Sequence, residues 1–232
     1  MKKIIVSFLS LLFLPILIGS YIYISNSDNQ PDFYREIKKA ATDGLQEFAK
    51  QIPEGYENSY GFSSKYEVEN ATIGNVYEIY TISPEFLKFP NLDKRTFVKP
   101  VTEFRVEITY NNEVKTFLTV SKVNGNYKVV DLGGADLSRE FVKIINNSKD
   151  NNPRRIIFRL YQLQCDFLAT APYSENLRTG SNEIESFNFY STFSSRKTFP
   201  GINEAVIKYS FNDIIPHISA KYSESFKEGG IR

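Results

Sequence analysis

Hydrophobic and polar residues alternate most regularly between residues 101 and 134. Phe104, Val106 and Ile108 alternate with polar residues that include Glu107, which is the period-2 pattern of a strand with one buried and one solvated face. We therefore expect an antiparallel meander of three strands in this stretch. On this pattern Glu107 faces solvent, and its replacement by lysine is expected to cost little stability.

Two asparagine-containing dipeptides mark the turns of the meander. Asn111–Asn112 and Asn124–Gly125 both tolerate the positive φ angles that two-residue hairpin loops require. If Asn124–Gly125 forms such a loop, Val120 and Val129 lie opposite each other on neighbouring strands. Val106, Val120 and Val129 are then expected to point into the core.

A helical pattern precedes the meander, at residues 32–50. Pro31 and Asp32 are typical of a helix start, and Pro53 and Gly55 end the pattern. Its hydrophobic positions recur at helical spacing and are Phe33, Ile37, Ala40, Ala41, Leu45, Phe48 and Ile52. We expect this stripe to pack on the sheet, the alternative being a membrane or a partner helix.

The remaining patterns predict shorter elements. The segment 154–171 fits the helical and the strand period, and its β-branched and aromatic residues favour a strand. This strand would pair with a second one at residues 187–193. The other predicted elements are a strand at 76–82, a helix at 137–147, a strand at 205–211 and a helix at 212–222 interrupted by Pro216.

Together these elements predict an α+β fold. An N-terminal helix packs on an antiparallel meander, and a smaller β-rich α+β half follows. The asparagine-rich segment 146–153 separates an α+β domain at residues 32–148 from a β-rich subdomain at residues 153–232. In outline, the helix and meander over residues 32–147 resemble the cystatin-like and NTF2-like arrangements and several protease propeptides. Fold alone does not give function.

The first 27 residues have the pattern of a signal peptide or an N-terminal membrane anchor. Two lysines precede an uncharged, mostly apolar run at residues 4–24. A signal peptide has a hydrophobic region of about 7–15 residues, whereas a spanning helix needs about 20, so the length favours an anchor. Cleavage after Ser20 or Ser27 is the alternative. In both cases the rest of the chain is expected outside the cytoplasm.

Composition and charge narrow the classes of partner. Hydrophobic residues make up 41% of the chain and charged residues 24%, which are values of a globular protein. The 28 Lys and Arg residues almost balance the 27 Asp and Glu residues. No net positive field attracts the protein to a phosphate backbone, so we expect no nucleic-acid partner.

One local pattern has a chemical interpretation. Gly133 and Gly134 lie between a predicted strand and a helix start, where backbone amides can bind an anion. Asp131 and Asp136 flank them and would repel a phosphate. We therefore favour a tight turn with Asp136 as the N-cap of the helix over a weak anion site.

The residues that usually carry catalysis are scarce. Cys165 is the single cysteine and His217 the single histidine, and they are far apart in the sequence. We expect both to be structural, with Cys165 a small apolar residue in a strand. A zinc site built from histidine and cysteine is excluded by their number, and we expect no cofactor.

These observations favour a non-catalytic binding module of the bacterial cell envelope. It would be tethered to the membrane by its N-terminal segment, or secreted, and would bind a protein or cell-wall partner. A peptidase inhibitor or propeptide-like regulator is the alternative. A hydrolase that uses carboxylates ranks third, because Asp and Glu are abundant.

Overall fold

A computed structural model describes residues 32–87, 89, 91–148, 154–171, 183–202 and 207–228. These residues belong to one compact unit. The predicted targeting segment, residues 1–27, lies outside the described residues. The same holds for residues 149–153, where the two predicted domains would meet. None of the described helices is both long enough and apolar enough to cross a membrane.

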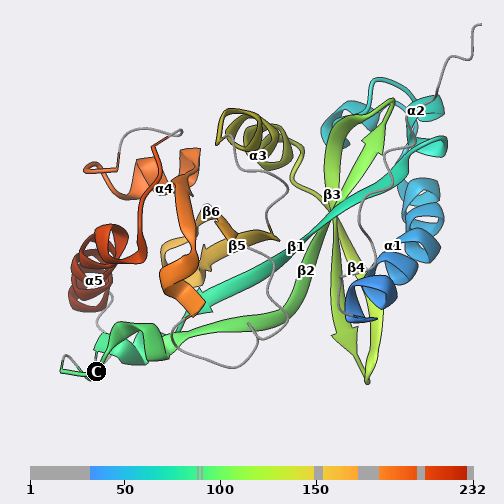
Figure 1. Cartoon of the computed structure of the whole chain (residues 1–232). Helices are drawn as coiled ribbons and strands as arrows, with labels where there is room; N and C mark the ends of the chain where they lie inside the picture. Colours follow the sequence, from blue (N-terminus) through green and yellow to red (C-terminus); the bar gives the residue numbers. More distant parts are fainter. Residues whose placement is uncertain are drawn as a thin grey trace, which may run out of the picture. The chain divides into compact units, whose positions relative to one another are not determined.

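The described chain combines helices with one sheet, which confirms the α+β class (Figure 1). The helices are α1 (Asp32–Gln51), α2 (Lys65–Glu69), α3 (Ala135–Ser148), α4 (Phe193–Thr198) and α5 (Phe211–Glu228). The strands are β1 (Thr72–Ile82), β2 (Val98–Tyr110), β3 (Glu113–Val123), β4 (Asn126–Gly133), β5 (Arg154–Leu160), β6 (Cys165–Ala171) and β7 (Asn188–Ser191).

The strands form a single mixed sheet in the order β4-β3-β2-β1-β5-β6-β7. Neighbouring strands are antiparallel, apart from β1 and β5, which run parallel. The predicted meander corresponds to β2–β4, and the strands of both predicted halves share the sheet. Because the sheet continues beyond β1 through β5, the cystatin-like or NTF2-like outline is not confirmed.

Helix α1 covers one face of the meander. Ile37, Ala41 and Leu45 on its apolar stripe are buried in the same cluster as Val106 and Val120. The expected packing of the helix on the sheet is therefore confirmed. The observed helix ends one residue after the predicted range of 32–50.

Helix α3 covers the opposite face of the sheet (Figure 1). Phe141 and Ile144 pack against side chains from β1, β3, β5, β6 and β7, among them Tyr77 and Phe117. Both faces of the central strands are thus buried. This arrangement explains why a simple alternation of buried and solvated positions describes the meander only in part.

Glu107 shows the consequence for a residue predicted to face solvent. Only 1% of it is exposed, so the prediction of a solvated position is wrong. The Tyr77 hydroxyl and Arg155 Nη1 both donate to its Oε1, at 2.6 and 2.8 Å. The backbone N–H and the side-chain amide of Asn75 donate to Oε2, at 3.0 and 2.7 Å. Burial raises the pKa of Tyr77 well above its ordinary value, and the charge of Glu107 adds to the shift.

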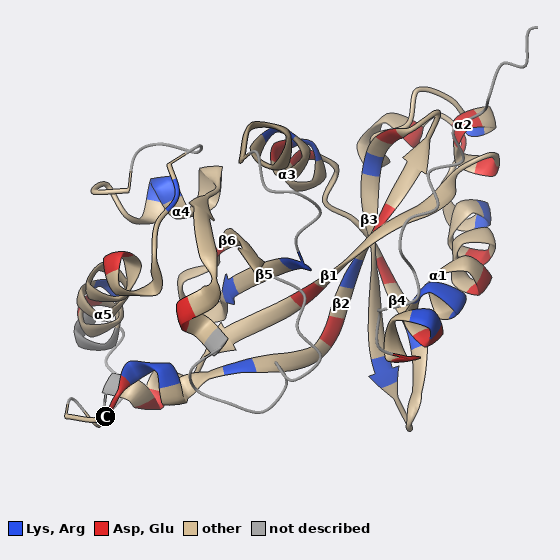
Figure 2. Cartoon of the chain, viewed as in Figure 1, with Lys and Arg blue, Asp and Glu red and all other residues tan. Residues whose placement is uncertain are grey.

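A second buried ion pair lies on the α1 face of the same strands. Arg154 Nε donates to Glu78 Oε1 at 2.7 Å, and the Tyr34 hydroxyl of α1 donates to the same carboxylate. Charged positions on β1, β2 and β5 are visible in Figure 2. Because Arg154 and Arg155 are consecutive on β5, they reach opposite faces of the sheet. The two pairs therefore hold β5 in parallel register beside β1.

The hairpin turns are confirmed. Asn111, Asn112 and Asn124 have φ angles of 49°, 63° and 51°, the left-handed region in which asparagine is tolerated. Val120 pairs with Val129, as the sequence predicts.

Gly125 gives a test of the second turn. Its φ is +84°, and a Cβ atom at this position would meet no other atom within 4 Å. We expect Gly125→Val to lower the free energy of unfolding by about 1 kcal/mol or more through backbone strain alone. Gly133→Val is the control, because that position is equally open and its φ lies outside the left-handed region. Equal urea midpoints for the two variants would contradict the expectation.

The segment 154–171 forms two strands rather than one. β5 and β6 pair as a hairpin around a 3₁₀ turn at Tyr161–Leu163, and Gln164 has a φ of 49°. The strand interpretation is correct and the single uninterrupted strand is wrong. The turn was missed because it contains none of the Gly, Pro, Asn, Asp or Ser residues that usually indicate one. β6 pairs with β7, as expected for residues 187–193.

The C-terminal part differs from the prediction in two details. The strand predicted at 205–211 is wrong over its described part: among residues 207–210 only Tyr209 pairs with the sheet, through a single bridge to Phe189, and Phe211 begins α5. Residues 205 and 206 lie outside the described residues. Pro216 lies inside α5 without interrupting it. The hydrogen bond that proline cannot donate would go to the carbonyl of Asn212, which lies on the exposed side of the helix start.

Candidate functional site

The glycines singled out in the sequence lie at the turn between β4 and α3. Gly133 is the last residue of β4, and Gly134 has a φ of +85°. The Gly134 carbonyl accepts a hydrogen bond from the Ser138 N–H at 2.9 Å. Because α3 begins at Ala135, Asp136 lies within its first turn and the prediction of Asp136 as N-cap is wrong. A weak anion site at Gly133 and Gly134 stays the less favoured alternative to a turn.

Cys165 and His217 lie in different environments. Cys165 is buried in a cluster of apolar residues, and burial raises the pKa of its thiol to about 12. The thiol is therefore protonated at neutral pH, whereas a cysteine nucleophile reacts as the thiolate. His217 is exposed on α5 beside Gly201.

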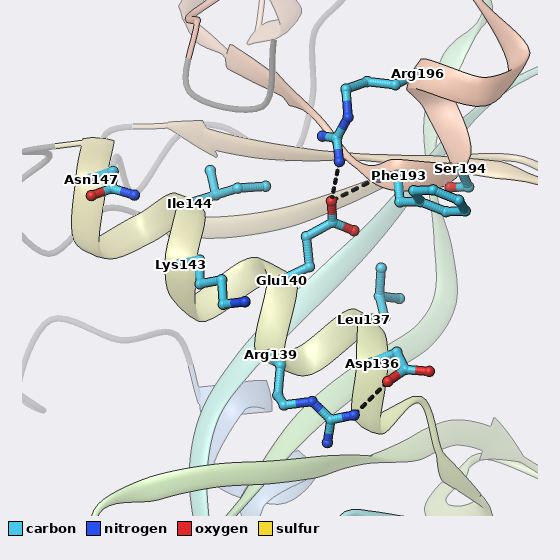
Figure 3. Close-up of a pocket in the computed structure, with 10 residues that line it drawn as sticks. All are labelled: Asp136, Leu137, Arg139, Glu140, Lys143, Ile144, Asn147, Phe193, Ser194 and Arg196. Carbon is cyan, nitrogen blue, oxygen red and sulfur yellow. Dashed lines mark hydrogen bonds and ion pairs between the residues drawn. The ribbon is translucent and has the colours of Figure 1, made fainter. Parts of the chain in front are cut away.

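A groove between α3 and α4 is the strongest candidate for a functional site (Figure 3). It has a volume of about 740 Å³, within the range of about 300–1,000 Å³ typical of ligand pockets. The residues that line it are Asp136, Leu137, Arg139, Glu140, Lys143, Ile144, Asn147, Phe193, Ser194 and Arg196.

Helical periodicity arranges the α3 side of the groove in two stripes. Leu137, Glu140 and Ile144 are three or four residues apart and therefore lie on one face of the helix. In Figure 3 these three side chains point toward α4. Asp136, Arg139, Lys143 and Asn147 form the adjacent stripe. The groove thus has a largely apolar floor beside a polar rim.

Glu140 connects the two walls of the groove. Its Oε1 accepts hydrogen bonds from the Phe193 N–H at 2.7 Å and from Arg196 Nη2 at 2.9 Å. Arg196 also donates to the Ser191 carbonyl at 2.8 Å, which ties the guanidinium to the end of β7. The side chains of Glu140 and Arg196 are only 20% and 24% exposed, so this pair is shielded from solvent more than a surface salt bridge. It holds α4 at a fixed position against α3.

The start of α4 determines where Phe193 points. Thr192 is the N-cap, and its side chain and that of Ser195 form a reciprocal capping box. Both residues are fully buried, whereas Phe193, the first residue of the helix, is 69% exposed. A buried cap therefore places an aromatic ring on the surface at the edge of the groove.

The charges of the rim are only partly paired. Arg139 forms an ion pair with Asp136 one turn away. Lys143 is exposed and has no ion-pair or hydrogen-bond partner among the residues that the structure describes. The groove can therefore offer apolar contact through Phe193 and Leu137 together with one uncompensated positive charge.

Sequence reasoning missed this groove because its walls are far apart in the sequence. It placed Phe193 in a strand with Phe187 and Phe189, which share its parity. The structure buries Phe187 and Phe189 and begins α4 at Phe193. Thr192 is a residue type preferred at N-caps, and this local signal could have located the helix start.

Comparisons of the chain with protein-family models, curated proteins and solved structures found no match. The described residues contain no group of three or more His, Cys, Asp or Glu side chains placed to hold a metal ion. The function is therefore argued from the geometry of the groove.

Proposed function

We propose that this protein is a non-catalytic binding module that accepts a segment of a partner protein in the groove between α3 and α4. The exposed ring of Phe193 beside this groove carries the proposal. A large aromatic side chain is costly to leave in water, and aromatic residues dominate the energetics of protein interfaces. The ion pair of Glu140 and Arg196 supports it, because a fixed groove loses little entropy when a partner binds.

The lining of the groove indicates the chemistry of the segment. An apolar side chain would pack between Phe193 and Leu137, and a carboxylate would complement Lys143. Leu137 and Lys143 are six residues apart on α3, which corresponds to about 9 Å along the helix axis. An extended segment spans this distance with about three residues. The segment therefore carries an apolar residue and an acidic residue about three positions apart.

The proposal includes the expectation that residues 1–27 direct the chain to the membrane. The binding module would then stand outside the cytoplasm, where the partner is a protein of the cell envelope. Fractionation of the full chain would test this location independently of the groove.

Selection from a random peptide library displayed on phage tests the binding function. We expect enriched peptides that share an apolar residue and an Asp or Glu about three positions away. Phe193→Ala should weaken binding of these peptides by about tenfold or more, and Lys143→Glu should weaken it further through charge repulsion. The measurement is the dissociation constant of synthetic versions of the enriched peptides.

Phe89→Ala is the matched control, because Phe89 is also an exposed phenylalanine and does not line the groove. Its affinity for the peptides should equal that of the unaltered chain. The proposal fails if no common pattern is enriched. It also fails if Phe193→Ala binds the enriched peptides as tightly as Phe89→Ala does.

A further inference from the structure

A second pocket lies between α1, α2 and the beginning of β1, outside the groove described above. Its volume is about 650 Å³, which suits a small molecule. The residues that line it are Thr42, Leu45, Gln46, Ala49, Lys50, Lys65, Val68, Glu69, Ala71, Thr72 and Ile73.

The apolar part of this lining is entirely aliphatic. Leu45 and Val68 are buried and provide the deepest surface, and Ala49, Ala71 and Ile73 are half-buried around them. No aromatic side chain is among the residues that line the pocket. Such a surface gives contact to a flexible hydrocarbon chain but no ring on which a planar ligand would stack.

The polar part of the lining carries a net positive charge. Lys50 at the end of α1 and Lys65 at the start of α2 are both exposed at the pocket, and Glu69 is the single acid. Neither lysine has an ion-pair or hydrogen-bond partner among the described residues. Two uncompensated ammonium groups against one carboxylate favour a ligand with an anionic end.

We propose that this pocket binds a free aliphatic carboxylate. The hydrocarbon chain would lie on Leu45 and Val68, and the carboxylate would accept hydrogen bonds from Lys50 or Lys65. Each CH₂ group that the pocket buries adds to the hydrophobic stabilisation of the complex, so affinity rises with chain length. The ammonium groups orient the ligand with its carboxylate outward.

Titration calorimetry of the full chain with dodecanoate below its micellar concentration tests this site. We expect saturable binding of one dodecanoate and weaker binding of octanoate. Dodecyltrimethylammonium, which has the same chain and the opposite charge, should bind at least about tenfold more weakly. If dodecanoate shows no saturable binding to the unaltered protein, the proposal is wrong.

Two pairs of variants locate the ligand. Gln46→Trp changes an exposed residue of the lining and fills the pocket, whereas Glu47→Trp places the same ring on an exposed neighbouring position outside it. Only Gln46→Trp should lower the affinity, by about tenfold or more. Equal affinities of the two variants would place the ligand elsewhere and overturn the proposal.

The lysines are tested in the same way. The double variant Lys50→Glu with Lys65→Glu should lose dodecanoate affinity, whereas Lys122→Glu with Lys128→Glu, an equal charge change on β3 and β4, should not. A membrane surface is the competing partner. If Lys50 and Lys65 prove necessary for binding to anionic phospholipid vesicles while free dodecanoate shows no saturable binding, the lysines serve a membrane and the proposal is wrong.

Discussion

Glu107→Lys is expected to lower the free energy of unfolding by about 3–5 kcal/mol or more. The variant removes the carboxylate that neutralises Arg155 in a buried site, and breaking a buried ion pair costs about this amount. It also places a second positive charge beside Arg155 and leaves the Asn75 N–H without its acceptor. Urea unfolding followed by circular dichroism measures the effect.

Glu47→Lys is the control for this experiment. Glu47 is exposed on α1, so the same change of charge should stay within about 0.5 kcal/mol. If Glu107→Lys fails to fold, Glu107→Gln gives a milder test, since it keeps the shape, removes the charge and replaces one of the two accepting oxygens by an amide group that cannot accept. A urea midpoint of Glu107→Gln equal to that of the unaltered protein would show that the buried charge pair contributes nothing.

Val120→Asp is expected to lower the free energy of unfolding by several kcal/mol. The total for a typical domain is about 5–15 kcal/mol. Val120 is fully buried between α1 and the meander. An aspartate there would be an isolated charge in an apolar layer, or would have to be protonated to fold. The urea midpoint should therefore fall far below that of the unaltered chain.

Val130→Asp is the matched control for Val120→Asp. Val130 lies on the edge strand β4 and is 46% exposed. A carboxylate at this position therefore stays hydrated. We expect a change within about 0.5 kcal/mol. If both variants unfold at the same urea concentration, the assignment of Val120 to the core is wrong.

The two substitutions show which part of the fold was predictable. The hairpins and the core position of Val120 follow from short-range rules, because asparagine at a positive φ and period-2 alternation both act within a few residues. The burial of Glu107 depends on its ion pair with Arg155, which is 48 residues away in the sequence. No local sequence pattern indicates a partner at that separation along the chain.

One local signal did accompany the buried carboxylate. Gly74 interrupts a strand, and glycine at such a position often marks a bulge or a close approach. The ladder between β1 and β2 shifts register between Ile73 and Val76. The shift leaves the Asn75 N–H free to donate to Glu107, and a Cβ atom on Gly74 would lie 2.9 Å from the Glu107 carboxylate.

The candidate groove was beyond sequence reasoning for the same physical reason. Glu140 and Arg196 are 56 residues apart, and their pairing depends on the position of α4 beside α3. The apolar spacing of residues 137–147 predicts the helix that contains Leu137 and Ile144, but it does not indicate which element this helix packs against. A groove requires two walls, and the second wall follows only from the tertiary structure.

The parallel pairing of β1 with β5 has a consequence for the order of events during synthesis. Glu78 and Arg154 are 76 residues apart, so the ribosome completes the meander and α3 before it releases β5. Until then one edge of β1 has no neighbouring strand. Long-range pairing of this kind is slow, and an unpaired edge is where nascent chains associate wrongly. The buried charge of Glu78 near that edge would disfavour a wrong partner that lacks an arginine.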